Sequence, residues 1–349
     1  MAVEEPSVVA AAGNAARIVR RGGGFTAEAD ESLMIGQVQL DGVADISAAR
    51  RAILAEGDAI MAAGNRAVPE LCRYGGGVRE IQVRELGEGS MVVHLLVDCR
   101  DAMGANMVNT VCESVSRRIA ELSRARSGLR ILSNLCDRRL VRVTARVPPE
   151  ALAGKGYSGP QVCDQVMRAS RFAERDIYRA ATHNKGVMNG ADAVVLATGN
   201  DWRAVEAGAH AFAARDGRYR PLCTWRSDEQ GRLCGRLEMP LALGIVGGSS
   251  RAHQGARLAL EILGVKSVRE LAMVVAAAGM ASNLAALRAL ATEGIQAGHM
   301  TLHARSVAIA AGAVGEQTEA VARRMCAEKR VTLEAAEEIL RELSTENSK

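Results

Sequence analysis

The chain has 349 residues, with 44 Lys+Arg against 40 Asp+Glu, a formal net charge of +4 and 48% hydrophobic residues. This length allows about two domains of ordinary size, and the composition argues against intrinsic disorder. Only 3% of the residues are aromatic and no basic block dominates the sequence, which argues against nucleic acid as a partner.

The N-terminus shows neither the basic nor the apolar region of a signal peptide, and the longest apolar run, Leu271 to Ala281, is too short to span a bilayer. The eight cysteines include no Cys-x-x-Cys pair. His299 and His303 have zinc-ligand spacing, but Met300 stands where a zincin needs glutamate, so we expect no metal. These features predict a cytoplasmic protein with reduced thiols and no membrane segment.

The hydrophobic patterns predict an alternation of helices and strands. A helix begins at Pro6 and ends at Gly22–Gly24. Further elements are expected in this order: a strand over 33–43, a helix over 46–65, strands over 81–86 and 91–97, a helix over 105–122, and extended segments over 129–132 and 141–147. Beyond Pro148-Pro149 the chain is expected to be mainly helical, with turns at Gly186, Gly190 and Gly199.

Strand, helix, strand, strand, helix, strand is the order of a ferredoxin-like βαββαβ domain. We therefore predict an α+β fold in which this small domain, residues 31–135, is inserted in a mainly helical large domain. The large domain comprises residues 1–30 and 136–300, and residues 301–349 form a mobile helical lobe at the C-terminus.

The segment from Asp101 to Asn106 joins an apolar strand to a helix. The free N–H groups of such a helix start attract an anion, and Gly104 would let a phosphate approach. The alternative is an ordinary helix capped by aspartate. No Gly-x-Gly-x-x-Gly motif is present, so a Rossmann fold finds no support.

Residues 178–190 concentrate Arg, His, Asn and Lys and are expected to form a loop, either lining a polar site or simply solvated. Asp201 follows the apolar run Val194 to Leu196, so we expect it at the buried end of an element with Lys185 as its partner. Gly298 suggests a bend beside His299, although a structural role for that histidine is the simpler reading.

Five segments, taken together, resemble the bacterial class II 3-hydroxy-3-methylglutaryl-coenzyme A reductases. They are residues 3–7 (VEEPS), 101–106 (DAMGAN), 182–186 (THNKG), 198–201 (TGND) and 294–305 (GIQAGHMTLHAR). The resemblance implies reduction of 3-hydroxy-3-methylglutaryl-CoA to mevalonate and CoA, or the reverse, through a thiohemiacetal and mevaldehyde. It also implies two equivalents of NADH or NADPH, with NADH slightly favoured.

By similarity, four residues fall on the catalytic positions: Glu5, Lys185, Asp201 and His299. Three others fall on positions that hold the hydroxymethylglutaryl group: Ser7, Arg179 and Asn189. The dinucleotide is expected to contact Asp101, Met103, Gly104, Ala105, Asn106 and Asn134. In this scheme Lys185 stabilises the oxyanion, Asp201 tunes that lysine, His299 protonates the CoA thiolate and Glu5 serves the second reduction.

The sequence departs from the family pattern in three places. An N-terminal segment that the family uses for subunit contact and CoA binding is expected to be missing, and Ser282 stands where a glutamine is common. Residues 65–68 lack the aspartate that some NADH-dependent members carry, which leaves the choice of cofactor open. We expect a homodimer or larger homo-oligomer; the alternative to an enzyme is a truncated, non-catalytic paralogue that binds a ligand or another subunit.

Overall fold

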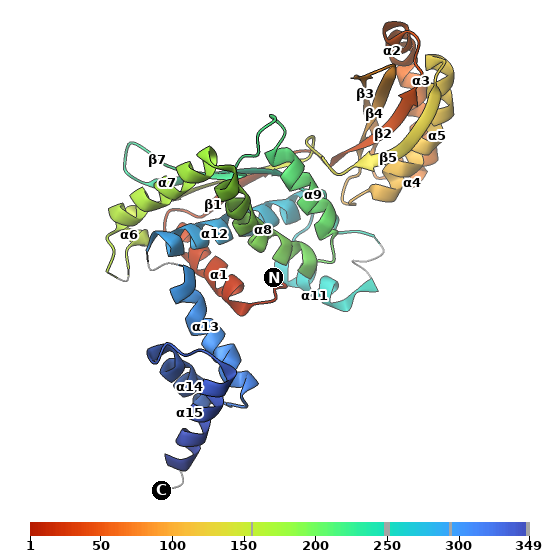
Figure 1. The fold of residues 1–349 in the computed structure, drawn as a ribbon. Helices are drawn as coiled ribbons and strands as arrows, with labels where there is room; N and C mark the ends of the chain where they lie inside the picture. The colour runs from red at the N-terminus through yellow and green to blue at the C-terminus, as the bar shows by residue number, and fades with distance from the viewer. Residues whose placement is uncertain (155, 248–251, 293–294, 347–349) are drawn as a thin grey trace.

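The computed structural model describes residues 1–154, 156–247, 252–292 and 295–346. The chain is a mixed α/β protein whose buried apolar side chains form three clusters, one in each of three bodies that Figure 1 shows side by side. The large body lies in the middle, the small body is built from residues near 34–136, and the C-terminal body extends from the far side of the large one.

The large body combines a four-stranded antiparallel sheet, ordered β1-β6-β8-β7, with a layer of helices. Its strands are β1 (Phe25–Ala29), β6 (Leu140–Val147), β7 (Cys223–Ser227) and β8 (Leu233–Pro240). Its helices are α1 (Pro6–Arg20), α6 (Pro149–Leu152), α7 (Gly159–Arg175), α8 (Ile177–Ala197), α9 (Trp202–Ala213), α11 (Gln254–Leu263) and α12 (Val268–Ala291). The helix at Pro6 and the mainly helical character after residue 148 were correctly predicted, whereas β1, β7 and β8 were missed.

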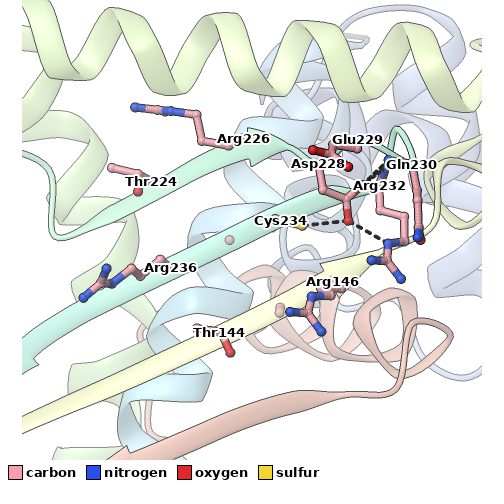
Figure 2. A pocket seen from close by; sticks show the side chains of 12 residues that line it. Thr144, Arg146, Thr224, Arg226, Asp228, Glu229, Gln230, Arg232, Cys234 and Arg236 are labelled. Atoms are coloured by element: carbon pink, nitrogen blue, oxygen red, sulfur yellow. Dashed lines mark hydrogen bonds and ion pairs between the residues drawn. The ribbon is translucent and has the colours of Figure 1, made fainter.

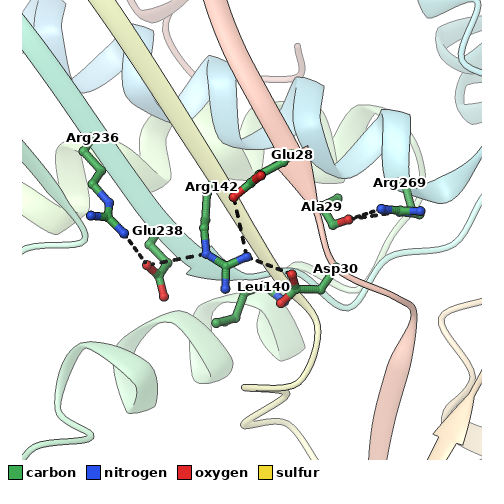
Figure 3. A network of polar contacts seen from close by, with 8 residues as sticks. All are labelled: Glu28, Ala29, Asp30, Leu140, Arg142, Arg236, Glu238 and Arg269. Carbon is green, nitrogen blue, oxygen red and sulfur yellow. Dashed lines mark hydrogen bonds and ion pairs between the residues drawn. The ribbon is translucent and has the colours of Figure 1, made fainter.

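One face of this sheet is buried under helices and the other is polar, which follows from the alternation along β6. Val143 and Val147 are buried, while Thr144 and Arg146 between them are exposed. On the polar face the Arg142 guanidinium lies 2.8 Å from Asp30 and 3.8 Å from Glu238 (Figure 3). These carboxylates raise the pKa of Arg142, and the ion pairs connect β6 to β8 and to the residue directly after β1.

The small body holds a second antiparallel sheet, ordered β3-β4-β2-β5. Its strands are β2 (Leu33–Asp41), β3 (Gly77–Gly87), β4 (Ser90–Asp98) and β5 (Arg126–Ser133), and its helices are α2 (Ile46–Ala55), α3 (Gly57–Ala67), α4 (Pro69–Arg73) and α5 (Ala105–Ser123). The elements follow the predicted order, but the single helix expected over 46–65 breaks at Glu56, directly before Gly57, into α2 and α3. Glycine is a poor helix residue, which favours a break at this point.

Helix α12 is the central helix of the large body and packs against α8, α1 and α7. The helix is longer than the apolar run at 271–281, which was expected to be too short to span a bilayer. By length and composition alone the whole helix could cross a membrane. Most of its apolar window is buried inside the protein, as in the core helix of a globular domain. Its small residues, among them Ala276 and Gly279, are covered within the chain, so they give no argument for a dimer.

The C-terminal body consists of α13 (Ile295–Ala310), α14 (Glu316–Ala327) and α15 (Leu333–Glu346). Ala308, Val321, Met325 and Ile339 form the centre of its own small core. Few contacts join it to α12 and α1. The C-terminus is helical, as expected, and the division of the chain at residue 301 and the mobility of the lobe stay predictions.

Candidate active site

Helix α8 contains the polar segment that was expected to be a loop, and that expectation was wrong. The helix runs from Ile177 to Ala197, and the Asp176 carboxylate caps it by accepting a hydrogen bond of 2.7 Å from the Arg179 amide. Gly186 and Gly190 lie inside it and form no turns. A Cβ on Gly190 would lie 2.2 Å from the Ala278 carbonyl oxygen, so the glycine lets α8 and α12 approach closely.

The helical period divides the Thr182–Gly186 motif between two faces. His183 and Asn184 are buried against the sheet: His183 Nε2 lies 2.8 Å from the Cys223 carbonyl oxygen, and Asn184 accepts from the Leu222 amide at 2.8 Å. Lys185 faces away from the sheet and is exposed. Half of the motif therefore fastens α8 to the strands, and the other half is available for chemistry.

Burial lowers the pKa of His183 from its ordinary value to about 4. The unfolded chain therefore binds a proton at this histidine near pH 6.5, whereas the folded protein binds it only near pH 4. The free energy of unfolding decreases as the pH falls from about 6.5 to about 4. On account of this residue, we expect the free energy of unfolding measured in urea to be about 2 kcal/mol lower at pH 5 than at pH 7. His183→Gln should lose this part of the pH dependence and the exposed control His303→Gln should keep it; equal pH dependence in both would contradict the assignment.

Lys185 and Asn189, one turn apart on α8, line a pocket of about 260 Å³. The pocket lies between α8, the start of α9 and the N-terminal segment, and its remaining lining residues are Ala2, Val3, Glu4, Val8, Met188, Asp192, Ala193, Leu196, Trp202 and Glu206. The Ala2 amide donates to the Ala193 carbonyl at 2.7 Å and holds the N-terminal segment along α8. Glu5, the N-cap of α1, follows directly, and Ser7 is buried in the first turn.

Asp201 lies beside this pocket but not where the sequence suggested. The buried end of α8 is Thr198, whose hydroxyl donates back to the Val194 carbonyl at 2.9 Å, and Gly199 then turns with φ +68°. Asp201 lies beyond the turn, exposed, where it caps α9 by accepting from the Ala204 amide at 3.1 Å. The burial expected of Asp201 was therefore wrong, and its interaction with Lys185 stays a prediction.

Arg179 and Ser282 lie apart from the pocket lining. Arg179 is half-buried on another face of α8, where burial lowers its pKa. Ser282 is buried where α12 meets Gly190. The backbone of α13 is helical through Gly298 and His299, so the bend expected there is not seen, and the His299 side chain lies outside the described part of the chain.

The segment from Asp101 to Asn106 forms the junction between β4 and α5, and here the alternative of an aspartate-capped helix was wrong. The N-cap is Gly104 with φ +99°, and in the described structure no side chain caps the helix. A Cβ on Gly104 would lie 2.2 Å from Cys99 Sγ, so the fold itself requires glycine. Asp101 accepts from the Val268 amide at 2.8 Å, while Asn134 is exposed just beyond β5.

Arg139 fastens this junction to the large body, and sequence reasoning missed it. It is 4% exposed, and its guanidinium donates to the carbonyls of Ala102 and Met103 at 3.3–3.4 Å and to that of Leu243 at 2.7 Å. The signal available in the sequence was an arginine directly before an apolar strand. If that arginine is buried with the strand, its guanidinium needs several hydrogen-bond acceptors.

Another hollow, of about 570 Å³, lies on the open face of the β6-β8-β7 sheet. Figure 2 shows Arg146 and Arg236 in it, together with Asp228, which binds Arg232 at 2.8 Å. It contains none of the predicted site residues. In the described residues no cluster of three or more His, Cys, Asp or Glu could hold a metal ion. The pocket at Lys185 is therefore the candidate active site.

Comparison with known proteins identifies the family of the chain. The family model described as hydroxymethylglutaryl-coenzyme A reductase matches residues 1–304. The 3-hydroxy-3-methylglutaryl-coenzyme A reductase of Archaeoglobus fulgidus is 47% identical over 98% of this chain and 78% of its own length. A probable reductase of Borreliella burgdorferi is 34% identical over 88% of this chain and 70% of its own.

Among solved structures, the class II 3-hydroxy-3-methylglutaryl-CoA reductase from Streptococcus pneumoniae bound to NADPH in open conformations matches with a TM-score of 0.81. It is 43% identical, and the match covers 98% of this chain and 83% of that one. A second structure from the same organism matches with a TM-score of 0.82. The chain belongs to the hydroxymethylglutaryl-coenzyme A reductase family.

Proposed function

We propose that this protein reduces the thioester of 3-hydroxy-3-methylglutaryl-CoA to mevalonate and CoA with two equivalents of NADH or NADPH. The observation that carries the proposal is the pocket in which Lys185 and Asn189 lie with Glu4 of the N-terminal segment and Trp202 of α9, the direct sequence neighbours of Glu5 and Asp201. Membership of the family makes the protein an oxidoreductase and disfavours the alternative of a non-catalytic ligand-binding paralogue.

Each proposed catalytic residue has a chemical task. A thioester carbonyl that accepts hydride becomes an oxyanion, and the Lys185 ammonium stabilises it by about 3 kcal/mol. His299 protonates the departing CoA thiolate, whose pKa is about 8.5 by analogy with a free thiol. Glu5 transfers a proton when the aldehyde is reduced, and Asp201, directly before the pocket residue Trp202, tunes Lys185 as the family resemblance implies.

Substrate contacts are assigned to Ser7, Arg179 and Asn189, with Arg179 binding the substrate carboxylate through charge-assisted hydrogen bonds. Of these, Asn189 lines the pocket. Arg179 is half-buried and makes no ion pair within the described structure, so its guanidinium can accept such a partner.

The nicotinamide cofactor supplies the hydride. The strand order β3-β4-β2-β5 supports a ferredoxin-like dinucleotide domain at 31–135. The start of α5, which no side chain caps, offers backbone N–H groups to a pyrophosphate, and the contacts are assigned to Asp101, Met103, Gly104, Ala105, Asn106 and Asn134. The S. pneumoniae relative is described as bound to NADPH.

The three apolar clusters support a division into a discontinuous substrate domain (1–30 and 136–300), the inserted domain and a C-terminal lobe (301–349). The buried thiols, such as those of Cys99 and Cys223, suit a cytoplasmic location. The homo-oligomer and the movement of the lobe rest on the family resemblance.

The proposal is tested by mixing the protein with 3-hydroxy-3-methylglutaryl-CoA and either NADPH or NADH while following nicotinamide absorbance. We expect two reduced cofactors to be consumed for each mevalonate formed. Binding of CoA without turnover by either cofactor would instead support the non-catalytic alternative. The ratio of kcat/KM values for the two cofactors determines the cofactor preference.

A further inference from the structure

Two acidic side chains, Asp192 of α8 and Glu206 of α9, lie in the wall of the pocket that contains Lys185. The two carboxyl groups lie close enough to shift each other's pKa. Two ionised carboxylates have only acceptors and repel each other, so this neighbourhood favours a proton on one of the two groups. The Oδ1 atom of Asp192 is buried and has no hydrogen-bond partner in the described structure, a poor situation for a charged group.

His210 determines which of the two groups is ionised. Its Nε2 atom lies 2.6 Å from a Glu206 oxygen one turn earlier on α9, and its Nδ1 atom lies 2.7 Å from the Tyr219 hydroxyl. The pairing raises the pKa of His210 and lowers that of Glu206. The proton of the carboxyl pair therefore resides on Asp192, where burial and the neighbouring Glu206 raise the pKa to about 8.

The acidic groups around the pocket already outnumber the basic ones. The N-terminal segment contributes Glu4 with Glu5 next to it, and α9 contributes Glu206 with Asp201 at its N-cap; the basic groups are Lys185 and, when protonated, His210. Helix α1 adds the apolar Val8, and α12, which packs on α8, meets it through small residues. Ionised Asp192 would add an uncompensated negative charge within this group.

We propose that Asp192 acts as a neutral carboxylic acid and is a positioning residue. Because it carries no charge, it does not offset the positive charge with which the Lys185 ammonium attracts the anionic thioester and the oxyanion formed from it. The inference rests on the proposed function of the pocket. Ionisation of Asp192 places a carboxylate two helical turns from Lys185 on the same wall, where it opposes both substrate binding and oxyanion formation.

The kinetic test compares kcat/KM from about pH 6 to pH 10 in three proteins. In the wild type kcat/KM falls about tenfold between pH 8.5 and 9.5, as expected for a single ionisation. Asp192→Asn cannot ionise, so it shows no such fall. Glu206→Gln removes the neighbouring charge and can donate an N–H to Asp192, so the fall begins at lower pH than in the wild type. Opposite shifts in the two variants are not expected from a merely structural role.

The matched control is Asp164→Asn, which changes an exposed aspartate of α7 that pairs with Arg168 outside the pocket. It should keep the wild-type profile. An unchanged alkaline fall in Asp192→Asn, or shifts in the same direction for Asp192→Asn and Glu206→Gln, would overturn the proposal.

Infrared difference spectra of wild type minus Asp192→Asn test the protonation without substrate. The C=O stretch of a protonated carboxylic acid should be present at pH 7 and absent above pH 9. Absence of the band at pH 7 would overturn the inference whatever the kinetics show. A titrating band in a protein that reduces no thioester would refute the proposed function and the positioning role together, while leaving the protonation of Asp192 established.

Discussion

Lys185→Ala is expected to lower kcat for thioester reduction about a hundred- to a thousand-fold. The ammonium is the one positive charge of α8 on the pocket wall, and loss of a single oxyanion-stabilising donor has an effect of this size. The side chain is exposed, so its truncation removes no core contact and the fold should be retained.

Steady-state kinetics with both cofactors, together with urea denaturation, measure these two expectations separately. Lys266→Ala removes another exposed lysine, near the start of α12 and far along the chain from the pocket, and serves as the control. If Lys185→Ala retained wild-type kcat while Lys266→Ala behaved as expected, the role assigned to Lys185 would be refuted.

Gly190→Ala is expected to destabilise the large body by about 3 kcal/mol. The new methyl group would lie 2.2 Å from the Ala278 carbonyl oxygen and 2.8 Å from Ser282 Cβ, so α8 and α12 would have to move apart. Most of the clash is with backbone, which cannot rotate away as a long side chain would.

Gly186→Ala on the same helix is a matched control, because the nearest atoms to its Cβ lie 3.9 Å away. There the substitution should be neutral or stabilise by up to about 1 kcal/mol, since alanine is the better helix residue. Urea denaturation of both variants measures the difference; equal free energies of unfolding would show that helix spacing does not depend on Gly190.

The sequence was informative where local signals act alone. Pro6 and the triple glycine at 22–24 bound the first helix, and alternation of side chains located the strands of the small body. It failed for α8, because a polar segment with two glycines becomes helical only through tertiary contact with α12, and no local pattern reports that contact. It also missed β7 and β8, which pair only with each other and with β6.

The motifs located the candidate site more reliably than they described its geometry. Lys185 and Asn189 do line one pocket, but Asp201 escaped burial because Thr198 ends α8 and Gly199 turns the chain outward. A motif identifies residue types at a given spacing. Whether the carboxylate in that motif is buried in the protein or exposed to solvent depends on where the preceding helix ends.

The separate apolar clusters of the three bodies have a consequence for spectroscopy. The chain has two tryptophans, and both belong to the large body: Trp225 is fully buried in its core and Trp202 begins α9 beside the pocket. Tryptophan fluorescence therefore reports on the large body, whereas melting of the small or C-terminal body would be silent in tryptophan fluorescence and visible by circular dichroism. Where the two signals separate on heating, the midpoint seen by tryptophan is the melting temperature of the large body with the pocket at Lys185, not of the whole chain.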